Sequence, residues 1–276
     1  MDPSPAIPAL DLFSLRGQNV LITGATRGIG AACAIALAEA GASICLVQRH
    51  PTKDGPEPNL TTYNAIKALF DNDDPANQRT LEIVHCDLDN LDEVKGLFDR
   101  ALEVFPNKEI HVLVNCAGIQ RRAPAVDFGE KEWDEVLNVN LKSVFLLSQA
   151  AGRHMVPLRR GKIINFCSLL TFQGGFTVPA YAAAKGALGQ LTKAFANEWS
   201  KDNVQVNGIC PGYVKTDMNE RLLNDPTRLR QISERIPAGR WAEPRDFAGP
   251  VVFLASPASH YVCGELLVVD GGWMGR

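Results

Sequence analysis

Short apolar runs alternate with longer segments whose apolar residues recur at helical spacing, from Asn19 to near the end of the chain. β-Branched runs of this kind are typical of buried parallel strands, and their alternation with helices indicates repeated β-α-β units. The pattern predicts one sheet of seven strands, at Asn19–Thr23, Ser43–Gln48, Leu81–His85, Ile110–Asn115, Lys162–Phe166, Gln205–Ile209 and Glu265–Val269. Helices are predicted at Gly28–Ala40, Thr61–Phe70, Leu91–Phe105, Trp133–Arg153, Ala180–Ser200 and Arg245–Ala255. We therefore expect an α/β fold, a doubly wound parallel sheet covered by helices on both faces.

Three segments depart from this regular alternation. The polar stretch 50–79 contains Pro51, Gly55, Pro56, Pro58 and Pro75, which favours a solvated connection over a functional segment. Residues 215–240 carry apolar positions at helical spacing among many charges, as expected of a lid over a substrate. Residues 1–15 read as an N-terminal extension, and no linker marks a second domain within 1–276.

Composition and charge exclude several classes of function. A formal net charge of −3 provides no basic surface for nucleic acid. The seven cysteines are scattered without a Cys-x-x-Cys pair, so neither a disulfide framework nor a metal site is expected. No apolar run approaches the roughly 18 residues of a membrane span, and MDPSPAIPAL does not resemble a secretory signal. We expect a cytoplasmic protein that acts on small molecules.

A glycine-rich turn follows the first predicted strand and opens an alanine-rich helix. Its sequence at 23–30 is TGATRGIG, with glycines spaced Gly-x-x-x-Gly-x-Gly. Glycine lets the backbone approach a pyrophosphate, and the free N–H groups of a helix N-terminus attract its charge. The turn is therefore interpreted as a dinucleotide site, although such glycines can also serve structure alone.

The end of the second predicted strand bears on the choice of cofactor. An acidic residue there would receive the ribose hydroxyls of NAD, but this chain has Gln48 and Arg49. Arg49, with Arg27 in the glycine turn, could clamp the 2′-phosphate of NADP. Both arginines could instead be ordinary surface charges. NADP(H) is the favoured cofactor, and NAD(H) is the alternative.

Tyr181 and Lys185 lie four residues apart in a predicted helix, and therefore on one face of it. Free tyrosine titrates near pH 10, so proton exchange at neutral pH requires a stabilised phenolate. Lys185 and a positively charged nicotinamide ring could supply that stabilisation. Ser168 follows the fifth predicted strand, where its hydroxyl could orient a substrate carbonyl. Asn140, in a predicted helix, is either a surface amide or the anchor of a water in the proton path.

Together these residues resemble the short-chain dehydrogenase/reductase family, from about Phe13 to Trp273. The resemblance rests on the glycine turn, Asp87, Asn115–Gly118, Asn140, Ser168, Tyr181, Lys185 and Pro211-Gly212, in the order and spacing of that family. It implies a single Rossmann-like domain, usually in a homotetramer. The catalytic residues that it implies are Asn140, Ser168, Tyr181 and Lys185. The cofactor contacts that it implies are Gly24, Thr26, Arg27, Gly28, Ile29, Gly30, Arg49, Asp87, Leu88, Asn115, Ala117, Gly118, Tyr181, Lys185, Pro211, Gly212, Val214 and Thr216.

Within that family the chain is most similar to the sugar-acid dehydrogenases of the gluconate type. The matching segments include GIQRR at 118–122, FQGG at 172–175, RIPAGRW at 235–241 and DGGW at 270–273. They suggest a polyol carboxylate as substrate, with Arg121 or Arg122 on the carboxylate and Gln173 on a hydroxyl. One departure is that Gln48-Arg49 does not resemble an NAD site, whereas that subgroup often prefers NAD.

The sequence is also compatible with two other functions. A ketoreductase acting on aromatic or polyketide ketones would use the same Ser168, Tyr181 and Lys185, but its cleft would be mostly apolar. A dinucleotide-binding protein without catalysis would not need these three residues. The sequence therefore favours an oxidoreductase that interconverts a secondary alcohol and a ketone.

Overall fold

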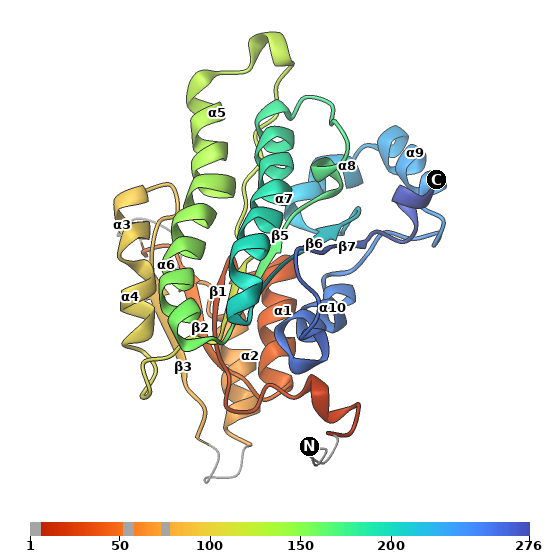
Figure 1. The fold of residues 1–276 in the computed structure, drawn as a ribbon. Helices are drawn as coiled ribbons and strands as arrows, with labels where there is room; N and C mark the ends of the chain where they lie inside the picture. The colour runs from red at the N-terminus through yellow and green to blue at the C-terminus, as the bar shows by residue number, and fades with distance from the viewer. Residues whose placement is uncertain (1–6, 52–57, 73–77) are drawn as a thin grey trace.

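The computed structural model describes residues 7–51, 58–72 and 78–276. Within them, seven parallel strands form one sheet, as predicted, and their order in it is β3-β2-β1-β4-β5-β6-β7 (Figure 1). The strands are β1 (Asn19–Thr23), β2 (Ser43–Gln48), β3 (Leu81–His85), β4 (Val112–Asn115), β5 (Gly161–Phe166), β6 (Val204–Pro211) and β7 (Leu266–Val269). Of the residues singled out in the polar stretch, Gly55, Pro56 and Pro75 lie outside the described part of the chain.

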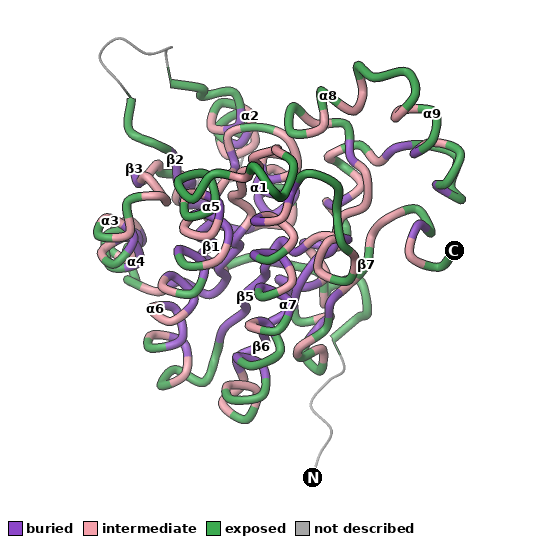
Figure 2. Tube along the Cα trace, turned by 90° about the horizontal axis from the view of Figure 1, so that it is seen from above, coloured by how far each residue is buried: buried purple, intermediate pink, exposed green. Residues whose placement is uncertain are grey.

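Helices cover both faces of the sheet, and the alternation of side chains along β1 shows why. Val20 and Ile22 belong to one buried cluster, which includes residues of α1 (Gly28–Glu39), α2 (Thr61–Phe70) and α10 (Ala248–Ala255). Leu21 points to the other face and belongs to a second cluster. This cluster includes residues of α4 (Leu97–Leu102), α6 (Ser143–Leu158) and α7 (Pro179–Trp199). Strand side chains alternate between faces, so one apolar run supplies both layers of the core. Figure 2 shows these strands as the buried centre of the molecule.

Two of the predicted helices are each interrupted near their middle in the structure. The helix predicted over Leu91–Phe105 is divided at Gly96 into α3 (Leu91–Lys95) and α4, because glycine is a weak helix former. The helix predicted over Trp133–Arg153 begins earlier, as α5 (Glu130–Leu137), and ends later, with α6. Between α5 and α6 the chain forms one π-helical segment, Asn138–Lys142, a feature that often marks functional sites.

The remaining differences are at element ends. The sheet pairing begins at Val112 and not at Ile110 in β4, whereas β6 extends one residue before and two beyond its predicted range. The last predicted helix opens as a 3₁₀ turn, Pro244–Phe247, before α10. No helix of the described residues has the length and apolar character needed to cross a bilayer.

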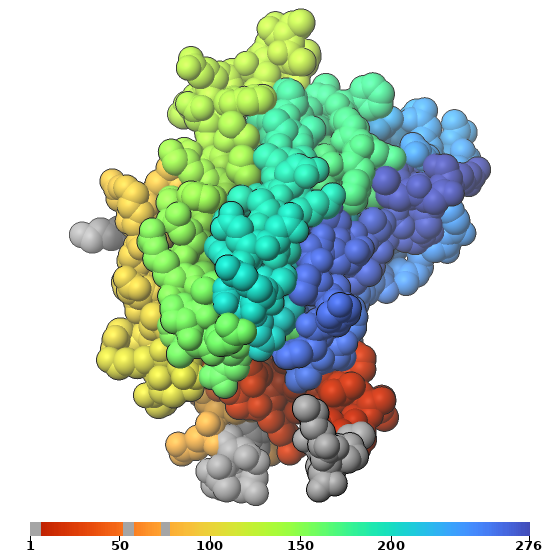
Figure 3. All heavy atoms as spheres, viewed as in Figure 1, coloured from red at the N-terminus to blue at the C-terminus, as the bar shows by residue number. Residues whose placement is uncertain are grey.

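Both segments at the margins of the domain pack against it. Leu15, in the predicted N-terminal extension, is fully buried, and its N–H donates to the carbonyl of Ala40. The segment 215–240 folds into α8 (Glu220–Leu223) and α9 (Pro226–Arg235), which lie beside the C-terminal residues (Figures 1 and 3). β1 lies between β2 and β4. Helix α1, which leads from β1 to β2, and helix α4, which leads to β4, cover opposite faces of the sheet. Open sheets of this kind bind ligands at such a reversal, outside the carboxyl ends of the strands.

Candidate active site

A cavity of about 1530 Å³ lies at the carboxyl ends of the strands. It is lined by the glycine turn, by the ends of β2, β4, β5 and β6, by α7, and by α8 and α9. The predicted site residues on its wall are Gly24, Thr26, Arg27, Gly28, Ile29, Gly30, Arg49, Leu88, Ala117, Gly118, Arg121, Arg122, Ser168, Gln173, Tyr181, Lys185, Pro211, Gly212, Val214 and Thr216. Asp87, Asn115 and Asn140 are not on that wall. The fold thus gathers most of the predicted site from segments far apart in sequence.

The glycine turn has no room for side chains at two positions. Gly24 has a φ of +70°, and a Cβ there would lie 2.6 Å from the backbone of Ala117. A Cβ on Gly30 would lie 2.2 Å from the carbonyl oxygen of Gly24. The turn is also joined to β4, because Thr23 Oγ1 accepts hydrogen bonds from the N–H groups of Cys116 and Ala117. The glycines therefore allow a compact turn whose backbone faces the cavity.

The N-terminus of α1 fits a phosphate group. Its N-cap residue, Arg27, makes no side-chain capping hydrogen bond. The first N–H groups of a helix carry partial positive charge and need partners from outside the helix. Gly28 and Thr216 meet beside this helix end, where a Cβ on Gly28 would lie 3.5 Å from Thr216 Cγ2. An anion such as a pyrophosphate suits this position.

Two residues that precede α2, Pro58 and Asn59, meet the end of β2 and were not predicted as site residues. Asn59 Nδ2 donates to the carbonyl of Thr26 at 3.1 Å, and Gln48 Nε2 donates to the carbonyl of Asn59 at 3.5 Å. Pro58 and Asn59 line the cavity, so interpreting 50–79 as only a solvated connection was incomplete. No motif in the sequence marks these two residues, because the hydrogen bonds that place them form only in the fold.

The two arginines considered for a 2′-phosphate are both exposed and both face a carboxylate. Arg27 lies 3.0 Å from Asp217, and Arg49 Nε lies 3.8 Å from Asp87 Oδ1. Exposed ion pairs of this kind contribute little to stability and exchange readily. The guanidinium groups can therefore leave these partners for a more highly charged phosphate.

Ser168 is held at the end of β5 by local hydrogen bonds. Its Oγ accepts from the N–H of Leu170 at 3.1 Å, and its own N–H donates to Thr171 Oγ1 at 3.2 Å. Thr171 Oγ1 in turn donates to the carbonyl of Lys185. This last bond ties the Ser168 turn to α7, so the hydroxyl faces the cavity from a fixed backbone.

Tyr181 and Lys185 share the cavity, as their spacing predicted. Lys185 Nζ lies 5.6 Å from the centre of the Tyr181 ring and donates to the carbonyl of Phe166 at 2.6 Å. Lys185 is only 4% exposed, whereas Tyr181 is half-buried at the wall. No described residue hydrogen-bonds the phenolic oxygen, which leaves it available to a ligand.

Asn140 is fully buried in the π-helical segment, so the interpretation as a surface amide was wrong. Its Oδ1 accepts from the N–H of Ile119 and its Nδ2 donates to the carbonyl of Ile119, both at 2.8 Å. A Cβ on Gly118 would lie 3.2 Å from Asn140 Oδ1 and 3.8 Å from Lys185 Nζ. Asn140 therefore fixes the strand-end loop directly beside Lys185.

Asn115 belongs to the interior and not to the cavity wall. Its Nδ2 donates to Ser148 Oγ at 3.1 Å and to Asn165 Oδ1 at 2.9 Å, and Asn165 Nδ2 donates to Thr192 Oγ1. This buried chain joins β4 and β5 to α6 and α7. The side chain of Asn115 thus supports the site from behind and does not reach the cavity wall.

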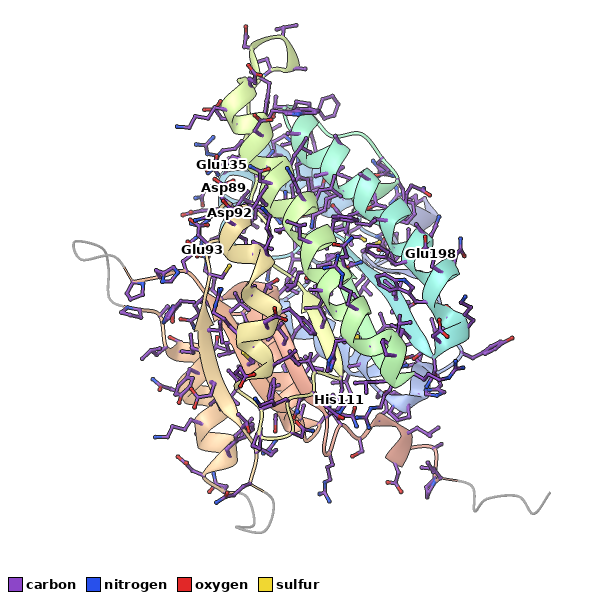
Figure 4. The ribbon with its side chains drawn as sticks, turned by 60° about the vertical axis from the view of Figure 1, so that its left-hand side comes forward. Asp89, Asp92, Glu93, His111, Glu135 and Glu198 are labelled. Carbon is purple, nitrogen blue, oxygen red and sulfur yellow. The ribbon has the colours of Figure 1, made fainter. Side chains whose placement is uncertain are left out.

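The two predicted substrate arginines differ sharply in their surroundings. Arg121 forms two 2.9 Å hydrogen bonds with the carboxylate of Glu135, which lies beside Asp89 on the α5 side of the molecule (Figure 4). Arg121 lines the cavity but has a carboxylate partner within the protein, so a substrate would have to compete with Glu135 for its guanidinium. Burial lowers the pKa of the Arg122 guanidinium, and the positive charges of Arg221 and Arg228 lower it further.

Gln173 and two unpredicted aromatic residues enclose the far side of the cavity. Trp273 Nε1 donates to Gln173 Oε1 at 3.2 Å, so the C-terminal residues meet the loop that follows Ser168. The Trp273 ring centre lies 4.7 Å from that of Tyr213. Burial raises the pKa of the Tyr213 phenol above its ordinary value. The sequence did not point to Tyr213 or assign a role to Trp273.

Comparison with known proteins agrees with this geometry. A family model described as enoyl-(acyl carrier protein) reductase matches residues 24–274. The chain is 47% identical to 2-dehydro-3-deoxy-D-gluconate 5-dehydrogenase of Pseudoalteromonas atlantica, covering 97% of this chain and 100% of that one. It is 41% identical to 5-keto-D-gluconate 5-reductase of Escherichia coli, covering 96% and 98% of the two chains. A gluconate 5-dehydrogenase from Burkholderia cenocepacia, crystallised with NADP and tartrate, superposes with a TM-score of 0.84 at 37% identity, covering 98% and 100%.

Proposed function

The chain belongs to the short-chain dehydrogenase/reductase family, and from this premise we propose that it is an NADP(H)-dependent oxidoreductase of sugar acids or related polyols. It interconverts a secondary alcohol and a ketone. The observation that carries the proposal is that Ser168, Tyr181 and Lys185 line one cavity with the glycine turn. The names of the relatives, which act on gluconate derivatives, support the substrate class.

Each catalytic residue has a distinct task in this proposal. The Ser168 hydroxyl orients the carbonyl oxygen of the substrate, and Tyr181 donates a proton to that oxygen on reduction or removes it on oxidation. The Lys185 ammonium, which lies 5.6 Å from the centre of the Tyr181 ring, would bind the nicotinamide ribose. Asn140 holds the loop that carries Gly118 beside Lys185, and it anchors a water in the proton path.

The residues at the wall fit a nicotinamide dinucleotide. The glycine turn and the uncapped N-terminus of α1 suit its pyrophosphate, and Leu88, Ala117, Pro211, Gly212, Val214 and Thr216 line the cavity on either side of the turn. When bound, the nicotinamide supplies the hydride for reduction and accepts it in oxidation. Asp87 lies beside Arg49, at the edge where the adenosine would bind.

Arg49 provides a test of the preference for NADP(H). We expect Arg49→Ala to raise KM for NADPH by about 10-fold, because a charge-assisted hydrogen bond is lost, while KM for NADH stays within about twofold. Steady-state kinetics with both cofactors measure this. Arg245→Ala is the matched control, because Arg245 is an exposed arginine paired with Glu39 outside the cavity. If Arg49→Ala changed KM equally for NADPH and NADH, Arg49 would not bind the 2′-phosphate.

Three wider features belong to the same proposal. We infer a homotetramer in the cytoplasm, as the family resemblance suggests, and sedimentation of the purified protein would test the assembly. The whole chain acts as one domain, with residues 1–15 as an N-terminal extension. Residues 215–240 act as a lid over the substrate, supported by the position of α8 and α9 at the cavity wall.

The direct test of substrate class is a panel of ketones reduced with NADPH and NADH. The panel contains keto-sugar acids, neutral keto-sugars and aromatic ketones, and the loss of reduced cofactor is followed by absorbance. The highest kcat/KM is expected for a keto-sugar acid with NADPH. A preference for aromatic ketones would instead make the protein a ketoreductase of another metabolite class.

A further inference from the structure

Besides Arg121, four arginines line the substrate side of the cavity, and three of them come from the lid segment. Arg221 lies on α8, Arg228 and Arg235 lie on α9, and Arg122 lies beyond the end of β4. The guanidinium of Arg235 stacks on Trp273, 3.9 Å from the ring centre. The other three have no aromatic ring of this kind beneath them among the described contacts.

The cluster also lacks a neutralising carboxylate. None of the ion pairs between described residues includes Arg122, Arg221 or Arg228, whereas Arg121 is fully paired with Glu135. Two acidic residues line the same cavity. One of them, Asp217, pairs with Arg27, and the other, Glu220, forms no ion pair with a described residue. The positive charge at this end of the cavity therefore exceeds the negative charge.

Arg122 lies close enough to Arg221, Arg228 and the two tyrosines of the cavity to interact electrostatically with each of them. The like charges of Arg221 and Arg228 add to burial in lowering the pKa of Arg122, while Tyr213 and Tyr181 act in the opposite direction. Placing like charges together in a half-buried cleft is unfavourable unless an anion joins them. The interaction with Tyr181 also places this cluster near the proposed catalytic residue.

Helix α9 carries one arginine on the face toward the cavity and another on the face toward solvent. Arg228 is half-buried at the cavity wall, and its Nη1 donates to Gln231 Oε1 at 3.2 Å. Arg230, two residues further, is exposed and lies 3.9 Å from Glu234 on the solvent side. Two residues on a helix differ by about half a turn, so one helix offers both a test residue and its control.

We propose that Arg228 and Arg221, together with Arg122, bind the carboxylate of the substrate and so make the lid the element that selects sugar acids over neutral sugars. This assignment rests on the proposed function. Arginine suits the task because its planar guanidinium donates two parallel hydrogen bonds to a carboxylate. A carboxylate bound there joins two lid residues to the loop after β4, which closes the lid over the reacting carbon.

The test compares two ketones of the same carbon skeleton, a keto-sugar acid and the neutral ketose in which a hydroxymethyl group replaces the carboxylate. In Arg228→Leu we expect KM for the acid to rise by about 10- to 100-fold, since an ionic hydrogen bond is lost. The kcat/KM for the neutral ketose and KM for NADPH should stay within about twofold. Arg221→Leu should likewise raise KM for the keto-sugar acid.

Arg230→Leu is the control and should leave both ketones unaffected. The inference is overturned if Arg228→Leu and Arg221→Leu lower kcat/KM equally for acid and neutral ketone, because that result indicates lid packing and not carboxylate recognition. It is also overturned if both variants match Arg230→Leu. Failure of the proposed function is distinguishable, because the wild-type enzyme would then reduce neither ketone with NADPH.

Discussion

Replacing Tyr181 with phenylalanine should lower kcat by at least about 10²-fold, and by as much as about 10⁴-fold. General acid–base catalysis contributes this range, and no other described group at the cavity is placed beside Lys185 in the same way. The phenolic oxygen makes no hydrogen bond to a described residue, so its removal leaves no buried partner unsatisfied. We therefore expect the melting temperature and the Kd for NADPH to remain close to wild type.

The measurement is steady-state reduction of the best keto-sugar acid, with NADPH binding followed separately by titration. Tyr261→Phe is the matched control, because Tyr261 is fully exposed and lies outside the cavity. If Tyr181→Phe retained wild-type kcat, the proton donor would have to be another group. A dinucleotide-binding protein without catalysis would show no turnover in either form.

Gly30→Ala should weaken NADPH binding by at least about 10-fold and destabilise the fold. The new methyl carbon would lie 2.2 Å from the carbonyl oxygen of Gly24, so the turn must open to accommodate it. Overpacking of this kind lowers the free energy of unfolding by about 1–3 kcal/mol. An opened turn also misplaces the backbone N–H groups that face the phosphate.

Denaturant unfolding and titration with NADPH measure the two effects of Gly30→Ala. Gly249→Ala in α10 is the control, since a Cβ there meets no atom within 4 Å. Alanine is the better helix former, so this control should be as stable as wild type or more stable by up to about 1 kcal/mol. Unchanged NADPH affinity in Gly30→Ala would mean that the dinucleotide does not bind at this turn.

Most of the fold could be predicted because the strands are buried on both faces. Runs such as Asn19–Thr23 and Ser43–Gln48 have nearly continuous apolar character, and turn residues mark their ends, so their bounds were predicted correctly. The break at Gly96 and the π-helical segment were not predicted, because neither changes the helical spacing of apolar residues enough to be visible. Such details depend on packing and on hydrogen bonds between distant segments.

The candidate site could be predicted in part for a similar reason. Tyr181 and Lys185 lie on one helix, and the glycine turn is continuous in sequence, so their geometry follows from local structure. The hydrogen bonds of Arg121 involve Glu135, and those of Asn115 involve Asn165, which in turn binds Thr192. Only the tertiary fold brings these partners together, so the sequence could not predict them. Arg228 could not be predicted as a substrate-binding residue for the same reason, because whether it faces the cavity or the solvent depends on how the lid packs.

The most direct test of the whole account is isotope transfer. The wild-type protein is given a keto-sugar acid and NADPH in which both hydrogens on the hydride-donating carbon of the nicotinamide are replaced by deuterium, and the product is analysed by mass spectrometry. We expect one deuterium on the carbon that gains the hydroxyl group, and we expect Tyr181→Phe to form this labelled product far more slowly. A product without deuterium, or equal rates of label transfer in the two proteins, would contradict the proposed mechanism.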